Sequence, residues 1–194
     1  MQINELAGQL LLATPSLHDP SFADTVVLVC HHDGEGGMGL IINRPQQITV
    51  PDVLEDLGIE IEGETPSNAA EEAGIQHVFE GGPVDSFRGF VLHDSWHIYE
   101  STMQISEELN LTSSRDVLEE LARGEGPEHY MLILGYAGWG AGQLEQELTD
   151  NDWLIAPSSR HIVFQEPPEQ RWAFGARCMG IDRREQLSDQ IGHA

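Results

Sequence analysis

The sequence contains no lysine, because all nine of its basic residues are arginine, and these face 33 Asp and Glu residues. The formal net charge is therefore −24. A surface this negative repels phosphate backbones and anionic headgroups, which excludes binding to DNA, RNA or membranes by Coulomb attraction alone. High salt screens the self-repulsion of such a chain, so we expect a halophilic setting with a salt-rich cytoplasm.

Cysteines and long apolar runs are also scarce. Only Cys30 and Cys178 occur, without a CxxC pattern, which argues against a disulfide framework and fits a reducing compartment. No run approaches the roughly 18 apolar residues that a membrane helix needs. The first residues lack the basic and apolar regions of a signal peptide. These absences predict a cytoplasmic protein without membrane association.

Known catalytic signatures are missing as well: there is no GxSxG elbow, Walker A loop or HExxH, and the glycine-rich segment 134–153 does not have the GxGxxG spacing. On an extended chain Cys30 and His32 would share one face, which leaves open a hydrolase or thiol-linked redox enzyme. His93 and His97 have the spacing of a helical zinc pair but follow a strand. We favour structural histidines, a buried thiol at Cys30, and no metal or cofactor.

What is present is a folded chain, with 40% hydrophobic residues arranged in short runs between turns. The predicted strands cover residues 8–13, 25–30, 38–43, 77–80, 87–93, 130–136, 153–156 and 161–164, with an exposed pair near 98–99 and 105. The predicted helices cover residues 50–57, 113–124, 143–148 and 169–179. This pattern favours an α+β fold. We predict one domain over 1–182, with an acidic excursion at 60–74 and a frayed tail at 183–194.

Several polar residues beside glycine-rich turns are candidate ligand contacts. Scarce arginines inside strand-like segments could clamp a carboxylate or phosphate, or form internal ion pairs. The glycines after the strand at 130–136 could bind an anion through backbone N–H groups, or simply form a tight turn. We take as the candidate ligand-binding set Asn43, Arg44, Gly82, Pro83, Arg88, Gly138, Gly140 and Gly142.

Spaced motifs in one order resemble the AlgH/YqgE family of bacterial proteins, over about residues 5–182. They are GQLLLA from Gly8, the segment 26–32, GLIINRP from Gly39, GGPV from Gly81, RGFVLH from Arg88, and the segment 134–153. The resemblance implies an α+β domain with a partly open, barrel-like, mainly antiparallel sheet and short flanking helices. It implies no reaction. The family is often labelled a transcriptional regulator through one member linked to alginate production, but no helix-turn-helix is visible in this chain. His31 stands where the family commonly has an acidic residue.

These observations favour a non-enzymatic binding or regulatory module with a pocket for a small acidic ligand or a peptide. The first alternative is an enzyme that uses Cys30 and His32. The second is a regulator that acts through a protein partner rather than by direct DNA contact. The sequence does not determine the oligomeric state.

Overall fold

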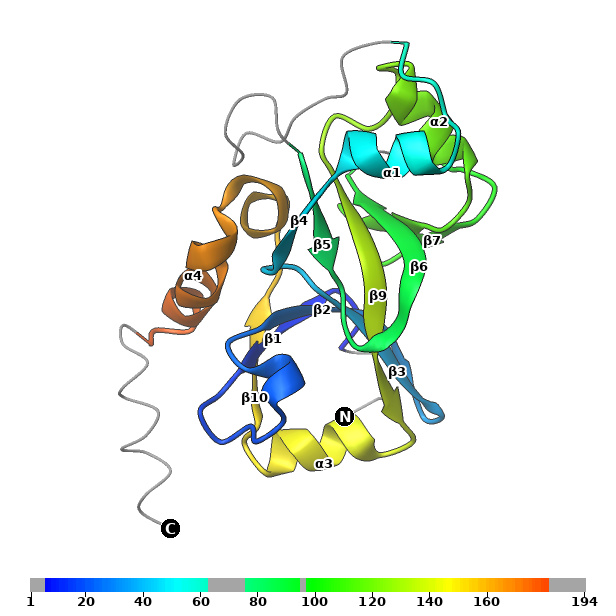
Figure 1. Ribbon diagram of the computed structural model, residues 1–194. Helices are drawn as coiled ribbons and strands as arrows, with labels where there is room; N and C mark the ends of the chain where they lie inside the picture. Colours follow the sequence, from blue (N-terminus) through cyan, green and yellow to red (C-terminus); the bar gives the residue numbers. More distant parts are fainter. Residues whose placement is uncertain (1–5, 63–75, 95–96, 182–194) are drawn as a thin grey trace.

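The computed structural model describes residues 6–62, 76–94 and 97–181. Figure 1 shows an open, curled sheet with α1 and α2 at one end, α3 at the other, and α4 along one side. The strands are β1 (Gln9–Ala13), β2 (Val26–Asp33), β3 (Gly36–Ile41), β4 (Pro45–Thr49), β5 (His77–Glu80), β6 (Val84–His93), β7 (Thr102–Gln104), β8 (Asn110–Thr112), β9 (Tyr130–Gly140) and β10 (Trp153–Pro157).

The strands form one sheet in the order β10-β1-β2-β3-β9-β6-β8-β7. Every neighbouring pair along this path is antiparallel, while β5 lies beside β9 in parallel and carries β4 at its other edge. The long strand β9 joins the two ends of the molecule, since its first half pairs with β6 and its second half with β3. The result is an α+β fold with an open antiparallel half-barrel, as expected.

The α-helices are short: α1 (Val50–Asp56), α2 (Asp116–Ala122), α3 (Gln143–Thr149) and α4 (Arg171–Cys178). Helix α1 begins with a capping box, in which Thr49 and Asp52 each accept a bond from the other's backbone N–H. The Thr49 hydroxyl and backbone N–H hold the pKa of Asp52 below its usual value. No helix in the described part of the chain is long and apolar enough to cross a membrane.

Buried apolar side chains fill both faces of the sheet. On β2, Val26 and Leu28 enter one cluster with Phe90 and Ile133, whereas alternate residues enter a second cluster under α3. A third cluster holds α1 and α2 against β6 and β9. Because both faces of the central strands are covered, these strands appear in the sequence as continuous apolar runs rather than as alternating patterns.

Three sequence-based predictions of secondary structure are wrong. Residues His161–Gln165 form a π-helix, η2, and not a strand, because three consecutive side chains there are buried in the core. A short apolar run does not by itself distinguish a strand from a buried helical turn. The strand pair expected at 98–99 and 105 lies instead at β7 and β8, and β8 is buried rather than exposed. Helix α2 begins after Arg115, without the Ser113 side-chain cap.

The other boundaries agree with the expectations to within a few residues, with two additions. Strand β4 was not predicted, and β9 continues through the glycine-rich segment as far as Gly140. The greater part of the acidic excursion and the whole tail at 183–194 lie outside the described residues.

Candidate functional site

Asn43 and Arg44, two of the predicted ligand residues, are both bonded to the loop that precedes β2. The Asn43 side chain accepts from the Val26 backbone N–H and donates to the carbonyl of Asp24. Arg44 donates to the carbonyls of Ser21 and Ala23, at 2.6 and 2.9 Å, and lies 3.7 Å from a Glu80 carboxylate oxygen. These contacts hold the loop in place and engage both terminal guanidinium nitrogens, Nη1 and Nη2.

The glycines near Pro83 allow two backbone segments to cross closely. A Cβ at Gly82 would lie 2.3 Å from the backbone of Tyr136, and a Cβ at Gly135 would lie 2.6 Å from the Gly82 carbonyl oxygen. Gly82 and Gly135 also have positive φ values of 149° and 76°. Only glycine fits such an approach without displacing the backbone.

The remaining predicted glycines do not form one anion-binding loop. Gly138 and Gly140 pair with Met38 and Gly36 inside the β3–β9 ladder. Gly142 has φ 74° and precedes α3, whose seven residues make it a short helix. The strand-to-helix turn expected after residue 136 is therefore limited to the residues between Gly140 and Gln143.

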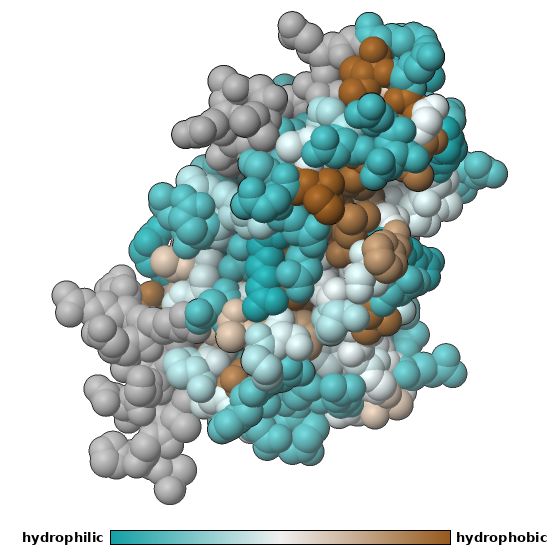
Figure 2. Space-filling view, in the orientation of Figure 1, coloured by the Kyte–Doolittle hydropathy of each residue, from teal (hydrophilic) through white to brown (hydrophobic). Residues whose placement is uncertain are grey.

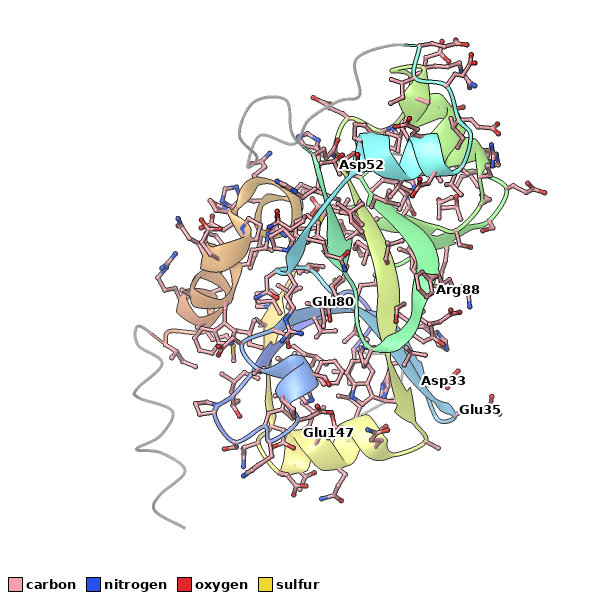
Figure 3. The ribbon with its side chains drawn as sticks, viewed as in Figure 1. Asp33, Glu35, Asp52, Glu80, Arg88 and Glu147 are labelled. Carbon is pink, nitrogen blue, oxygen red and sulfur yellow. The ribbon has the colours of Figure 1, made fainter. Side chains whose placement is uncertain are left out.

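Arg88 is exposed, and its guanidinium lies over the Phe90 ring, 5.3 Å from the centroid. Figure 3 shows Arg88 on the outer side of β6. Arg88 and the seven other predicted residues line neither of the two hollows described below. A ligand-binding role for these eight residues stays a prediction.

A β-bulge separates Cys30 from His32. The β2–β3 register shifts between Val29 and His31, so that Val29 and His32 point to one face while Cys30 packs into the core on the other. His32 Nε2 lies 3.4 Å from a Glu145 carboxylate oxygen on α3. Burial raises the pKa of the Cys30 thiol. The expectation that Cys30 and His32 share a face is therefore wrong, and a Cys–His pair has no geometric support.

The histidines near the end of β6 contact aromatic rings rather than a common metal position. His93 is fully buried, with Nε2 2.9 Å from the Thr112 hydroxyl and its ring edge-on to Tyr99. His97 stacks on Tyr99 with 4.6 Å between centroids. Burial chiefly, helped by the charge of His97, lowers the pKa of His93 to about 4, while Asp94 opposes that shift. Within the described residues, no group of three or more His, Cys, Asp or Glu side chains could hold a metal ion.

A polar cluster lies beside these histidines. The carboxylate of Asp94, which is 6% exposed, accepts from Arg160 Nη2 at 2.5 Å and lies 2.8 Å from Nδ1 of His129. Asp94 directly follows β6, His129 directly precedes β9, and Arg160 directly precedes η2. We interpret the cluster as a tether that ties η2 to the sheet.

An apolar hollow lies between α1, α2 and the face of β6 and β9, and we call it the α1–α2 groove. Its volume is about 260 Å³, and its walls are mainly hydrocarbon. Figure 2 shows apolar surface along α1 and below it over β6. The groove is lined by Val53, Leu57, Phe87, Gly89, Val91, Thr112, Ser113, Ser114, Arg115, Leu118, Leu132 and Leu134.

The local sequence explains how each wall forms. Val53 and Leu57 are four residues apart on α1 and in the turn after it, so that they share one helical face. Phe87, Gly89 and Val91 alternate along β6 and therefore share one face of the strand. Gly89 carries no side chain, and this leaves the floor of the groove open between Phe87 and Val91.

Phe87 forms the rim of the groove and is 94% exposed. A phenyl ring so open to water gains almost none of the free energy that burial would give, about 1.5–3 kcal/mol for a large apolar side chain. Leu57 on the opposite wall is 44% exposed. Exposed apolar groups around a hollow are typical of a surface that another molecule covers.

A second, polar hollow of about 210 Å³ adjoins the groove, and both share Arg115. Arg115 donates to Glu119 at 2.9 Å and to the Leu57 carbonyl at 3.2 Å, so its side chain forms the wall between the two. The polar hollow is lined by Gly58, Ile59, Glu60, Glu62, Arg115, Glu119 and Arg123.

The alternation of Phe87, Gly89 and Val91 along β6 is a sequence signal that could have indicated this surface. The neighbouring Arg88 was predicted as a ligand contact instead. Because alternate strand residues face opposite sides, Arg88 and Phe90 point away from the groove. The partners on α1, α2 and β9 lie far apart along the chain, and no local pattern predicted that they would meet.

The fold and this surface define a class: a small α+β half-barrel with an apolar groove at one end of its sheet. The AlgH-like family model matches residues 10–184, and the chain belongs to this family. A UPF0301 protein of Methylococcus capsulatus is 46% identical, with 97% of this chain and 96% of the relative covered. A UPF0301 protein of Thioalkalivibrio sulfidiphilus is 45% identical, with 98% of each covered.

Two solved structures have the same fold. The solution structure of AlgH from Pseudomonas aeruginosa matches with a TM-score of 0.75 and 42% identity, covering 97% of this chain and 96% of that one. The crystal structure of DIP2367 from Corynebacterium diphtheriae matches with a TM-score of 0.70 at 21% identity, covering 91% of this chain and 89% of that one. The second likeness extends to the fold alone.

Proposed function

We propose that this protein is a non-enzymatic binding module whose α1–α2 groove captures an apolar side chain of a peptide or protein partner. The observation that carries the proposal is the pairing of an apolar hollow of about 260 Å³ with a rim phenylalanine that is 94% exposed. Large apolar anchors that fill small pockets supply most of the affinity in protein interfaces.

The size of the groove favours a side chain over a whole small molecule. Sites for drug-sized ligands usually enclose about 300–1,000 Å³ and bury most of the ligand. The present groove is smaller and open on one side. Regulation through a protein partner would be one use of such a surface, whereas the net charge of −24 opposes direct contact with DNA.

The test adds a side chain at Gly89, which lines the groove. A Cβ added at Gly89 would meet only Leu134 among the described atoms, at 3.7 Å, and Gly89 is not at positive φ. Gly89→Val should therefore narrow the groove without straining the backbone, and valine suits a strand better than glycine does. The matched control is Gly138→Val, on β9, which lies outside the groove and within the originally predicted site.

The probe is the neutral dye N-phenyl-1-naphthylamine, whose fluorescence rises in apolar surroundings. We expect the wild type and Gly138→Val to bind it equally and Gly89→Val to bind about tenfold more weakly, since losing burial of a few carbon atoms is worth about 1–2 kcal/mol. Equal binding by all three proteins would refute the groove. Loss only in Gly138→Val would return the site to the glycine-rich segment.

A further inference from the structure

Charge on the surface around the α1–α2 groove indicates what kind of segment occupies it. Exposed Asp52 and Asp56 flank Val53 and Leu57 on α1. Figure 3 shows Asp52 on this helix, at the groove end of the molecule. The apolar opening thus has a negatively charged border along α1.

The polar hollow next to the groove is negative as well. It contains three carboxylates, Glu60, Glu62 and Glu119, against two guanidinium groups. Both cations are already engaged: Arg115 pairs with Glu119 at 2.9 Å, and Arg123 pairs with Glu125 at 3.1 Å. The Arg115 side chain separates the two hollows. An apolar group could therefore enter the α1–α2 groove while a neighbouring cation enters the polar hollow.

We propose that the occupant is a basic amphipathic segment of another protein, which places an apolar side chain in the α1–α2 groove and a neighbouring Lys or Arg against Glu60 and Glu62. This inference rests on the proposed function and specifies the partner. Charge complementarity raises association rates and discriminates against acidic competitors. A second copy of this chain does not fit, because it would bring the same charge of −24 to the interface and has no lysine to offer.

The experiment uses three fluorescein-labelled peptides that share the same Phe and Leu anchors and differ only in flanks of Lys, Gln or Glu. Fluorescence anisotropy gives Kd at about 0.1 M and about 1 M salt, where the Debye length falls from about 10 Å to about 3 Å. We expect the Lys peptide to bind about tenfold more tightly than the Gln peptide at low salt, as two or three surface charge pairs allow, and the difference to close at high salt.

Paired variants separate a local effect from the overall charge. Glu60→Gln with Glu62→Gln removes two acids from the polar hollow, whereas Glu35→Gln with Glu169→Gln removes two exposed acids elsewhere. Figure 3 shows Glu35 at the β2–β3 turn, far from α1. The first pair should weaken the Lys peptide several-fold and leave the Gln peptide unchanged, while the second pair should change neither.

The two proposals fail in different ways. If no peptide binds, or if Gly89→Val does not weaken binding, the groove is not a docking site and the proposed function fails. If the peptides bind and Gly89→Val weakens them, but the Gln or Glu peptide binds as tightly as the Lys peptide at low salt, only the basic partner is wrong. Equal effects of the two double variants would also overturn it.

Discussion

Protonation of His93 should destabilise the fold at mildly acidic pH. Its imidazole is fully buried, contacts the Thr112 hydroxyl and Tyr99, and has a pKa of about 4. In the unfolded chain a histidine has a pKa of about 6.5. Because the folded value is the lower one, the unfolded state takes up the proton first. The contribution of the neutral His93 imidazole to the free energy of unfolding is therefore present above about pH 6.5 and is lost progressively as pH falls toward 4.

The size of the effect follows from the two pKa values. Between pH 7 and pH 5, a shift from about 6.5 to about 4 lowers the free energy of unfolding by about 2 kcal/mol. The 33 acidic residues also change the stability of the fold with pH, so a difference between two proteins is needed. His93→Gln provides it, because glutamine can bond to Thr112 but does not titrate.

The assay is urea unfolding followed by tryptophan fluorescence at pH 7 and pH 5. Wild type should lose about 2 kcal/mol more than His93→Gln over this range. His18→Gln, which removes an exposed histidine, is the control for the substitution itself. NMR titration of the wild-type imidazole gives a second measurement that does not depend on whether the variant folds. Identical pH slopes for wild type and His93→Gln, or an imidazole that titrates near pH 6.5, would refute the reasoning.

Three further predictions concern stability and reactivity. Gly135→Ala should lower the free energy of unfolding by about 3 kcal/mol or more, because the added Cβ would meet the Gly82 carbonyl oxygen. Gly58→Ala is the control: it has a similar φ but lies in open space, so it should lower the free energy of unfolding by only about 1–2 kcal/mol in the same urea assay. Asp94→Asn should lower the thermal midpoint and the free energy of unfolding by about 1–3 kcal/mol, because Arg160 and His129 lose a nearly buried carboxylate; an unchanged midpoint would contradict the tether. Iodoacetamide should label exposed Cys178 in the native protein and Cys30 only after unfolding, as followed by mass spectrometry, since burial keeps the Cys30 thiol neutral. Rapid native labelling of Cys30 would revive the thiol alternative.

Much of the fold could be predicted from short-range patterns. The apolar runs at β1, β2 and β9 and the Thr49–Asp52 capping box are local features, and each forms the element that its residues favour. The π-helix η2 is the main exception. Its apolar residues are compatible with a strand or a buried helical turn, and only the contacts that it makes in the core decide between the two.

The site was less accessible to sequence reasoning. Arg44 was conspicuous because the chain has only nine basic residues, yet Arg44 and its neighbour Asn43 are both bonded to a nearby loop. Cys30 and His32 were expected to share a face, and one extra residue in β2 places them on opposite faces. A bulge of this kind is a property of pairing with β3, which the sequence of β2 alone does not reveal.

The sequence by itself determined the charge, the absence of known catalytic motifs, most of the secondary structure and the resemblance to a family. These follow from residue type and from spacings of two to four residues. Tertiary structure alone decided where the apolar surface remains open. The α1–α2 groove joins Leu57, Phe87, Leu118 and Leu134, whose separations along the chain exceed any helical or strand period. Only the pairing of β6 with β9 and the packing of both helices over them bring these side chains together, and leave Phe87 exposed to water.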